Sequence, residues 1–131
     1  MIGRFTGKKI SRIVSGGLCA FFLLALLADG LRAETADEMF ERGKGLAERK
    51  EYEHAIQAML DFQAQYPDHD RVPQAQYLMG AYQQKRNYLN SAIEEYERVI
   101  EDFPKSVYAA RARLRMAEIY QHMEKPEKSV E

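Results

Sequence analysis

The stretch that decides the fold is residues 75–104, AQYLMGAYQQKRNYLNSAIEEYERVIEDFP, because its landmarks recur 37 residues earlier in the chain. Within each copy a glycine, an alanine and a proline follow one another at equal spacing. The equivalent pairs are Gly43 and Gly80, Ala55 and Ala92, and Pro67 and Pro104. Self-similarity at a period of about 20–50 residues is typical of repeat proteins, so the sequence predicts a repeat architecture.

Each landmark has a physical reason in a pair of antiparallel helices. Two such helices approach closely only where their side chains are small. We expect Gly43, Gly80 and Ala117 to supply the first close contact of three successive units, and Ala55 and Ala92 to supply the second. A glycine inside a helix costs about 1 kcal/mol relative to alanine, so two glycines at equivalent sites imply a benefit in packing.

Apolar residues recur at the i, i+3, i+4, i+7 spacing of a helical stripe, and Pro67 and Pro104 are expected to end the second helix of each unit. Asp70 and Ser106 are the expected N-caps of the helices that follow. The predicted helices are 36–49, 52–65, 71–86, 89–102 and 106–123, with a short segment from Glu127. The predicted fold class is all-α, with antiparallel helix hairpins stacked as a short right-handed solenoid.

These landmarks, together with Met59 and Tyr96, resemble the tetratricopeptide repeat signature from Thr35 to the C-terminus. The unit departs from the usual length of about 34 residues because the loops after both prolines are longer. The run 75–80, AQYLMG, resembles a periplasmic subgroup that includes the Tol-Pal system coordinator and the outer-membrane assembly lipoprotein. The resemblance implies protein–protein scaffolding in the cell envelope by units of about 36–72 and 73–109 and a partial unit, 110–131.

Residues 1–33 differ from the rest of the chain. Four basic residues without an acid precede the apolar run 18–28, and the polar segment 29–33 follows it. A run of this length is about half of the ~20 residues needed to span a bilayer and falls within the ~7–15 residues of a signal peptide. We therefore expect residues 1–33 to be a secretory signal peptide, cleaved after Ala33 or after Gly30, and residues 34–131 to reach the periplasm. The alternative is an uncleaved inner-membrane anchor that extends back to Ile13.

The cysteine count and the net charge limit the kinds of membrane attachment and of partner that this chain can have. Cys19 is the only cysteine, so no disulfide can form within the chain, and its place before most of the apolar run disfavours a lipoprotein. Segment 1–33 holds five of the 19 basic and one of the 20 acidic residues, which leaves a net charge of −5, from 14 bases and 19 acids, on the rest. That charge disfavours nucleic acid, or a membrane surface after cleavage, as a partner.

No arrangement of residues indicates catalysis. The three histidines, His54, His69 and His122, lie in different predicted elements, whereas a metal or nucleophilic site needs converging groups. The cluster 68–70, DHD, lies in one loop, and three consecutive residues rarely face one ion. We expect no enzyme activity, no cofactor and no metal site.

The first helices of stacked hairpins line the concave face, where such arrays bind extended or helical peptides. The residues expected there are Phe40, Tyr77 and Leu114, and one turn later Lys44, Ala81 and Glu118, although Phe40 and Tyr77 would serve equally well in the core. Arg111 and Arg115, four residues apart, share one helix face. That face is either a solvated rim balanced by Glu118 or a contact for an acidic partner segment.

The third unit has a first helix but no room for a second within the sequence. Without that second helix, six residues of the first helix would be partly uncovered: Leu114, Met116, Ala117, Ile119, Tyr120 and Met123. In a solenoid each unit buries its apolar face against the next, so this sequence is expected to be a fragment or to be completed by a homodimer or another partner.

Three functional hypotheses follow. The first is an exported adaptor that binds envelope proteins, of unknown identity, on the concave face. The second is an inner-membrane-anchored subunit of an envelope assembly complex. The third is a non-catalytic accessory domain of an enzyme.

Overall fold

The computed structural model of the protein describes residues 32–124. The described part of the chain is all-helical and contains no strand. Its helices are α2 (Ala36–Glu48), α3 (Tyr52–Gln65), α4 (Val72–Lys85), α5 (Leu89–Asp102) and α6 (Val107–Glu124). Each boundary lies within one residue of its predicted position. The predicted signal or anchor segment, and the segment from Glu127, lie outside the described residues.

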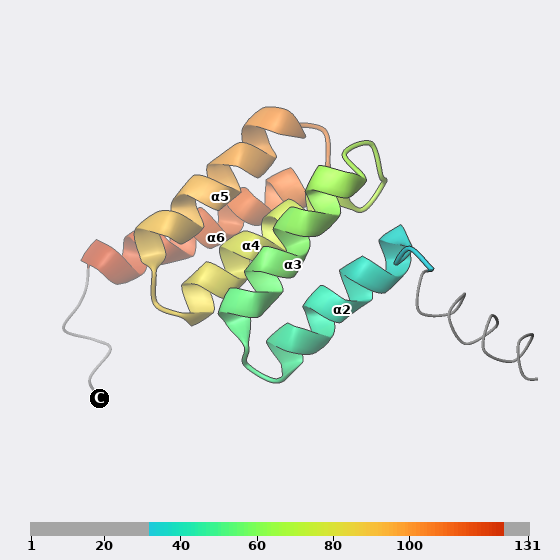
Figure 1. The fold of residues 1–131 in the computed structure, drawn as a ribbon. Coiled ribbons are helices and arrows are strands. Elements are labelled where there is room, and N and C mark those ends of the chain that lie inside the picture. Colours follow the sequence, from blue (N-terminus) through green and yellow to red (C-terminus); the bar gives the residue numbers. More distant parts are fainter. Residues whose placement is uncertain (1–31, 125–131) are drawn as a thin grey trace, which may run out of the picture. The chain divides into compact units, whose positions relative to one another are not determined.

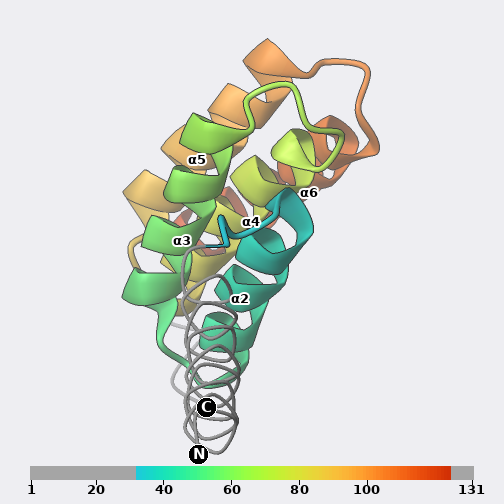
Figure 2. The ribbon, with the colours of Figure 1, turned by 45° about the vertical axis from the view of Figure 1, so that its right-hand side comes forward.

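The helices form two layers that alternate along the chain. The α2–α3 and α4–α5 pairs are antiparallel hairpins, and α6 packs beside the second hairpin against α5 and α4. The first helices α2, α4 and α6 lie in one layer, and the second helices α3 and α5 lie in the other (Figure 2). The predicted fold of stacked helix hairpins is confirmed.

The close approach within each hairpin occurs at the predicted glycines. A methyl group built on Gly43 would lie 2.8 Å from Cε of Met59, and one built on Gly80 would lie 2.6 Å from Cε1 of Tyr96. Ala55 and Ala92 are completely buried. Ala117, the equivalent residue of α6, is exposed instead, because no helix within the described residues lies against that side of α6.

Helices α4 and α6 bury equivalent stripes against the helices that precede them. The stripe of α4 is Val72, Ala75, Met79 and Tyr82, and that of α6, one repeat period later, is Ala109, Ala112, Met116 and Ile119. The expectation that Ile119 would be uncovered is wrong, since it is 1 % exposed, and Met116 is half-buried. The other four residues expected to be uncovered are exposed: Leu114, Ala117, Tyr120 and Met123.

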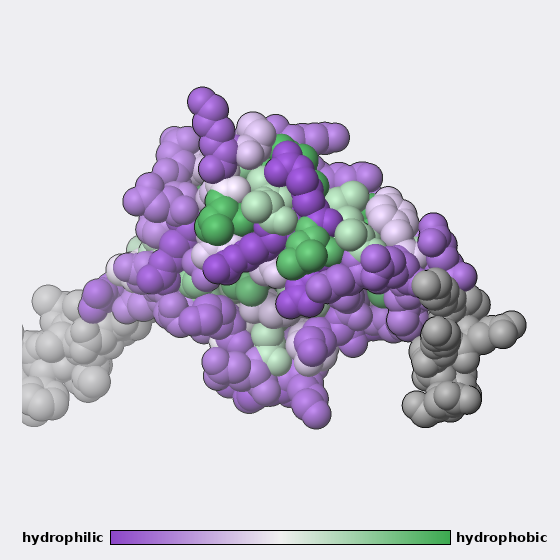
Figure 3. All heavy atoms as spheres, turned by 180° about the vertical axis from the view of Figure 1, so that it is seen from behind, coloured by the Kyte–Doolittle hydropathy of each residue, from purple (hydrophilic) through white to green (hydrophobic). Residues whose placement is uncertain are grey.

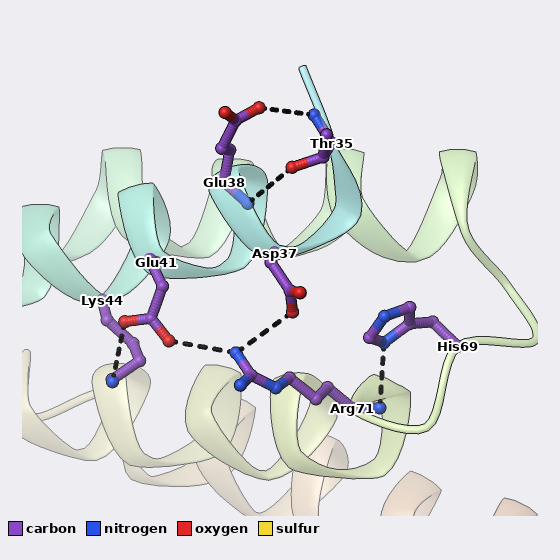
Figure 4. Close-up of polar contacts among 7 residues, drawn as sticks. All are labelled: Thr35, Asp37, Glu38, Glu41, Lys44, His69 and Arg71. Carbon is purple, nitrogen blue, oxygen red and sulfur yellow. Dashed lines mark hydrogen bonds and ion pairs between the residues drawn. The ribbon is translucent and has the colours of Figure 1, made fainter. Parts of the chain in front are cut away.

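At three of the helix starts a side chain is hydrogen-bonded to the backbone, each time in a different way. Thr35 and Glu38 form a capping box, with Oγ1 of Thr35 3.3 Å from the Glu38 amide nitrogen and a Glu38 carboxylate oxygen 2.8 Å from the Thr35 amide nitrogen (Figure 4). The Ser106 hydroxyl accepts a hydrogen bond from the Tyr108 amide, at 3.1 Å, as expected of a cap. The prediction for Asp70 is wrong: the cap position of α4 is Arg71, whose amide donates to Nδ1 of His69 at 3.2 Å.

The two turns that close the hairpins are also equivalent. Lys50 and Asn87, one repeat period apart, both adopt the left-handed backbone conformation, with φ of 64° and 65°. Asparagine tolerates this conformation better than lysine does. The same turn geometry therefore recurs with a less suitable residue in the first unit.

Candidate partner-binding grooves

A groove of about 350 Å³ lies between the first helices α2 and α4. Its lining comes from α2, from the first residue of α3 and from α4: Lys44, Ala47, Glu48, Tyr52, Gln74, Leu78, Ala81, Tyr82 and Lys85. We call this the α2–α4 groove. It lies on the layer where peptide binding was expected.

The floor of the α2–α4 groove is mainly apolar. The Tyr52 and Tyr82 rings lie 6.1 Å apart, and Leu78 and the small Ala81 continue the floor along α4. Burial of Tyr82, with a smaller contribution from the negative charge of Glu48, raises the pKa of its phenol to about 12. The phenol is therefore neutral at physiological pH, and the floor carries no charge of its own.

The rim of the α2–α4 groove carries charge of both signs. Lys44 is held 3.0 Å from the carboxylate of Glu41, which Arg71 also contacts from the start of α4 (Figure 4). Hydrogen bonds from Lys44, and then from Arg71, hold the pKa of Glu41 below its usual value. Glu48 and Lys85 also line the groove. An apolar lining with the Lys85 ammonium beside it suits a segment that combines apolar and acidic side chains.

A second groove lies between α4 and α6, lined by Ala81, Gln84, Lys85 and Arg115. We call this the α4–α6 groove. Arg115 is held by Glu118, with Nη1 2.8 Å from the carboxylate, and by the Tyr77 hydroxyl, which lies 3.4 Å from Nε. Because Ala81 and Lys85 line both grooves, α4 joins them into one surface across the first helices.

The expected site residues separate into three groups. Lys44, Ala81 and Arg115 line the grooves. Phe40 does not, because it is 1 % exposed and packs edge-on against Phe62 in the core. Tyr77 is half-buried between the Tyr96 and Tyr108 rings, at centroid distances of 5.5 and 5.7 Å, and its hydroxyl contacts Arg115 of the α4–α6 groove. The remaining three, Arg111, Leu114 and Glu118, are exposed on α6 and line neither groove.

The arginine face of α6 is partly occupied by neighbouring side chains. The guanidinium of Arg111 lies 5.3 Å from the centroid of the Tyr108 ring, and Arg115 is paired with Glu118. Each arginine therefore has a partner on its own helix, as expected of a solvated rim. Both stay accessible at the edge of the first-helix layer.

Sequence reasoning missed seven residues of the α2–α4 groove: Ala47, Glu48, Tyr52, Gln74, Leu78, Tyr82 and Lys85. Lys85 and Leu78 could have been found, because they lie four residues after and three residues before Ala81 and so share its helix face. Tyr52 could not, since it belongs to a second helix that was assigned wholly to the other layer.

Hydrophobic residues gather in the middle of the face that points away from the viewer in Figure 1, with hydrophilic residues around them (Figure 3).

Between residues 32 and 124 no group of histidine and acidic side chains is arranged to hold a metal ion. None of the helices in that range has the length and hydrophobicity of a membrane span.

Residues 74–106 match the family model described as tetratricopeptide repeat. The match begins in the first turn of α4 and extends past α5, so it covers nearly all of one hairpin. It supports a tetratricopeptide repeat family for this chain. Such repeats are protein–protein interaction modules that are typically non-catalytic and use extended concave surfaces. No curated protein gives a significant match to the chain.

Proposed function

We propose that the protein is an exported scaffold of the bacterial cell envelope that holds a segment of another protein in the α2–α4 groove. The observation that carries this proposal is the groove itself, which lies on the layer of first helices and has a mainly apolar lining that includes Leu78 and Ala81, with Lys85 beside them. The match to the tetratricopeptide repeat family supports a scaffold role.

The groove favours a segment with one or two apolar side chains and an acidic group. Leu78 and Ala81 would contact the apolar side chains, and Lys85 would face the acidic group. Small residues at the floor allow the partner backbone to approach closely. The resemblance of residues 75–80 to the periplasmic subgroup supports envelope proteins as partners.

A matched pair of alanines tests the groove. In the full chain, a photoreactive amino acid at Ala81 should cross-link a partner in envelope extract, whereas the same probe at Ala64 should not. Ala64 is exposed on α3, in the other layer. Ala81→Arg should abolish binding of that partner and Ala64→Arg should not. Equal cross-linking at both sites, or binding that survives Ala81→Arg, would remove the groove from consideration.

The cellular location is tested separately. N-terminal sequencing of the protein from the envelope should find a start near Glu34, as expected after signal cleavage. A retained N-terminus would favour the inner-membrane anchor, and recovery from the cytoplasm would contradict export in either form.

A further inference from the structure

We propose that α6 binds the α6 helix of a second copy of this chain in an antiparallel pair, with Ala117 on the twofold axis. The contact surface is the set of residues Arg113, Leu114, Ala117, Tyr120 and Gln121, called here the α6 face. It is separate from the grooves of the proposed function, so the two proposals fail independently.

Comparison of the three first helices shows that the α6 face is built to receive a helix. The five equivalent residues of α2, Met39 to Ala47, and of α4, Gln76 to Gln84, are all buried or half-buried, and the central Gly43 and Gly80 contact the second helix of the unit. All five residues of the α6 face are exposed. Leu114 is 62 % and Tyr120 45 % exposed, which is apolar surface that a helix would remove from water.

The α6 face is complementary to itself when reversed. Leu114 and Tyr120 lie three residues before and after Ala117, so an antiparallel pair places each Leu114 opposite the partner's Tyr120. The small side chain of Ala117 allows the two helices to approach at their crossing point. A twofold contact of this kind uses one patch on both copies and closes on itself.

The distribution of charge along α6 favours a second copy of the chain over an unrelated helix as the partner. The first half of α6 includes three arginines and no acid, and the second half includes two glutamates and no lysine or arginine. This order opposes the dipole of the helix, which favours acids near its start and bases near its end. Arg113 lies on the α6 face and Glu124 lies two turns after Ala117 on the same side, so an antiparallel pair brings Arg113 of each copy beside Glu124 of the other. A parallel pair would place arginine beside arginine.

The expected dimer is weak because a single helix of about 27 Å provides the whole contact. Analytical ultracentrifugation of the full chain, in mild non-ionic detergent, should show dimers that increase with protein concentration. Ala117→Arg should give monomers, whereas Ala64→Arg, on the other layer, should not change the distribution. Both alanines are exposed, so neither substitution disturbs the fold.

Charge reversal identifies the partner as a second copy. Arg113→Glu and Glu124→Arg should each weaken self-association by about tenfold or more, and mixing the two variants should restore it, because the mixed pair regains both contacts. In a Cys19→Ser background, Ala117→Cys should form a disulfide dimer and Ala64→Cys should not. A wild-type chain that is monomeric at all concentrations would overturn the proposal. So would dimers that survive Ala117→Arg, or an α6 face that captures only a different protein.

Discussion

Gly80 leaves no room for a side chain, because atoms of the rigid Tyr96 ring lie 2.6 and 2.7 Å from the position of a methyl group. Gly80→Ala should destabilise the protein by about 1–3 kcal/mol, as overpacking does, despite the gain of about 1 kcal/mol in helix propensity. Gly43→Ala should be close to neutral, because the obstructing atom is the flexible end of Met59. Urea unfolding followed by the helical circular dichroism signal measures both.

Gly45 provides the control, since it lies in the same helix as Gly43 and has no atom within 4 Å of an added methyl group. Gly45→Ala should therefore stabilise the protein by roughly 1 kcal/mol through helix propensity alone. If Gly80→Ala also stabilised the protein, the Tyr96 ring would have to move at little cost, and the close approach would not constrain the hairpin.

Glu95 makes folding depend on pH. Its carboxylate accepts a hydrogen bond from the Gln76 amide, but burial dominates and raises the pKa of Glu95 above its usual value of 4.5. Because the pKa is higher in the folded chain, the protonated Glu95 carboxyl group contributes stability to the fold. That stability is fully present below pH 4.5 and is lost as the pH rises through the folded pKa. Glu95→Gln should therefore stabilise the protein at pH 7, and its advantage should disappear below about pH 4.5. A larger advantage at acid pH would contradict this sign.

At the scale of the elements, Arg71 ties α2 to the start of α4. Its guanidinium lies 3.0 Å from Glu41 and 3.5 Å from Asp37 (Figure 4). It also lies 4.9 Å from the centroid of the Phe40 ring. Exposed ion pairs contribute little, so the ring contact, worth about 0.5–1 kcal/mol, should dominate. Arg71→Lys should therefore lower the free energy of unfolding by most of this amount, although lysine keeps the positive charge.

Lys44→Met is the matched test for Arg71, because it removes the other cation from Glu41 without touching the Phe40 ring. We expect thermal unfolding to show no measurable change for Lys44→Met and a lower midpoint for Arg71→Lys. The opposite order would mean that the ion pairs, rather than the ring, hold the two helices together.

The helices were predictable because the residues that mark their ends and close contacts belong to the same hairpin. Glycine, alanine and proline at fixed spacings located every helix to within one residue, since each acts through the backbone of its own hairpin. The cap of α4 was not predictable in this way. It depends on His69, whose ring packs against Phe62 at 5.4 Å, and so on a contact between elements. Thr35 and Glu38 did carry a readable signal, the T-x-x-E pattern of a capping box.

The groove was predictable only in part, for a reason that concerns the whole molecule. The spacing of the repeat showed that Lys44 and Ala81 belong to first helices. It did not show the rotation of each helix about its own axis, which decides which residues face the core. Phe40 is buried because that rotation points it at Phe62, whereas Lys85 is accessible. Rotation of a helix is set by packing against two neighbours at once, which one sequence does not reveal.

The order of the layers predicts a gradient of stability along the molecule. Helices α3, α4 and α5 pack against neighbours on both sides, whereas among the described residues α2 packs mainly against α3, and α6 packs only against α5 and α4. In a stacked array each unit depends on its neighbours, so the outer helices should open first. Hydrogen exchange should be slowest in α3–α5 and faster in α2 and α6. Uniform exchange along the chain would contradict this gradient.

The matching buried stripes of α4 and α6 bear on how such a gene evolves. Because α6 docks on α5 as α4 docks on α3, a tandem copy of one repeat period would meet only junctions that the molecule already contains. Its first helix would dock on α5, and α6 would dock on the duplicated second helix. Unequal recombination can therefore lengthen this kind of chain by whole units, with no new interface to be selected before the longer product folds.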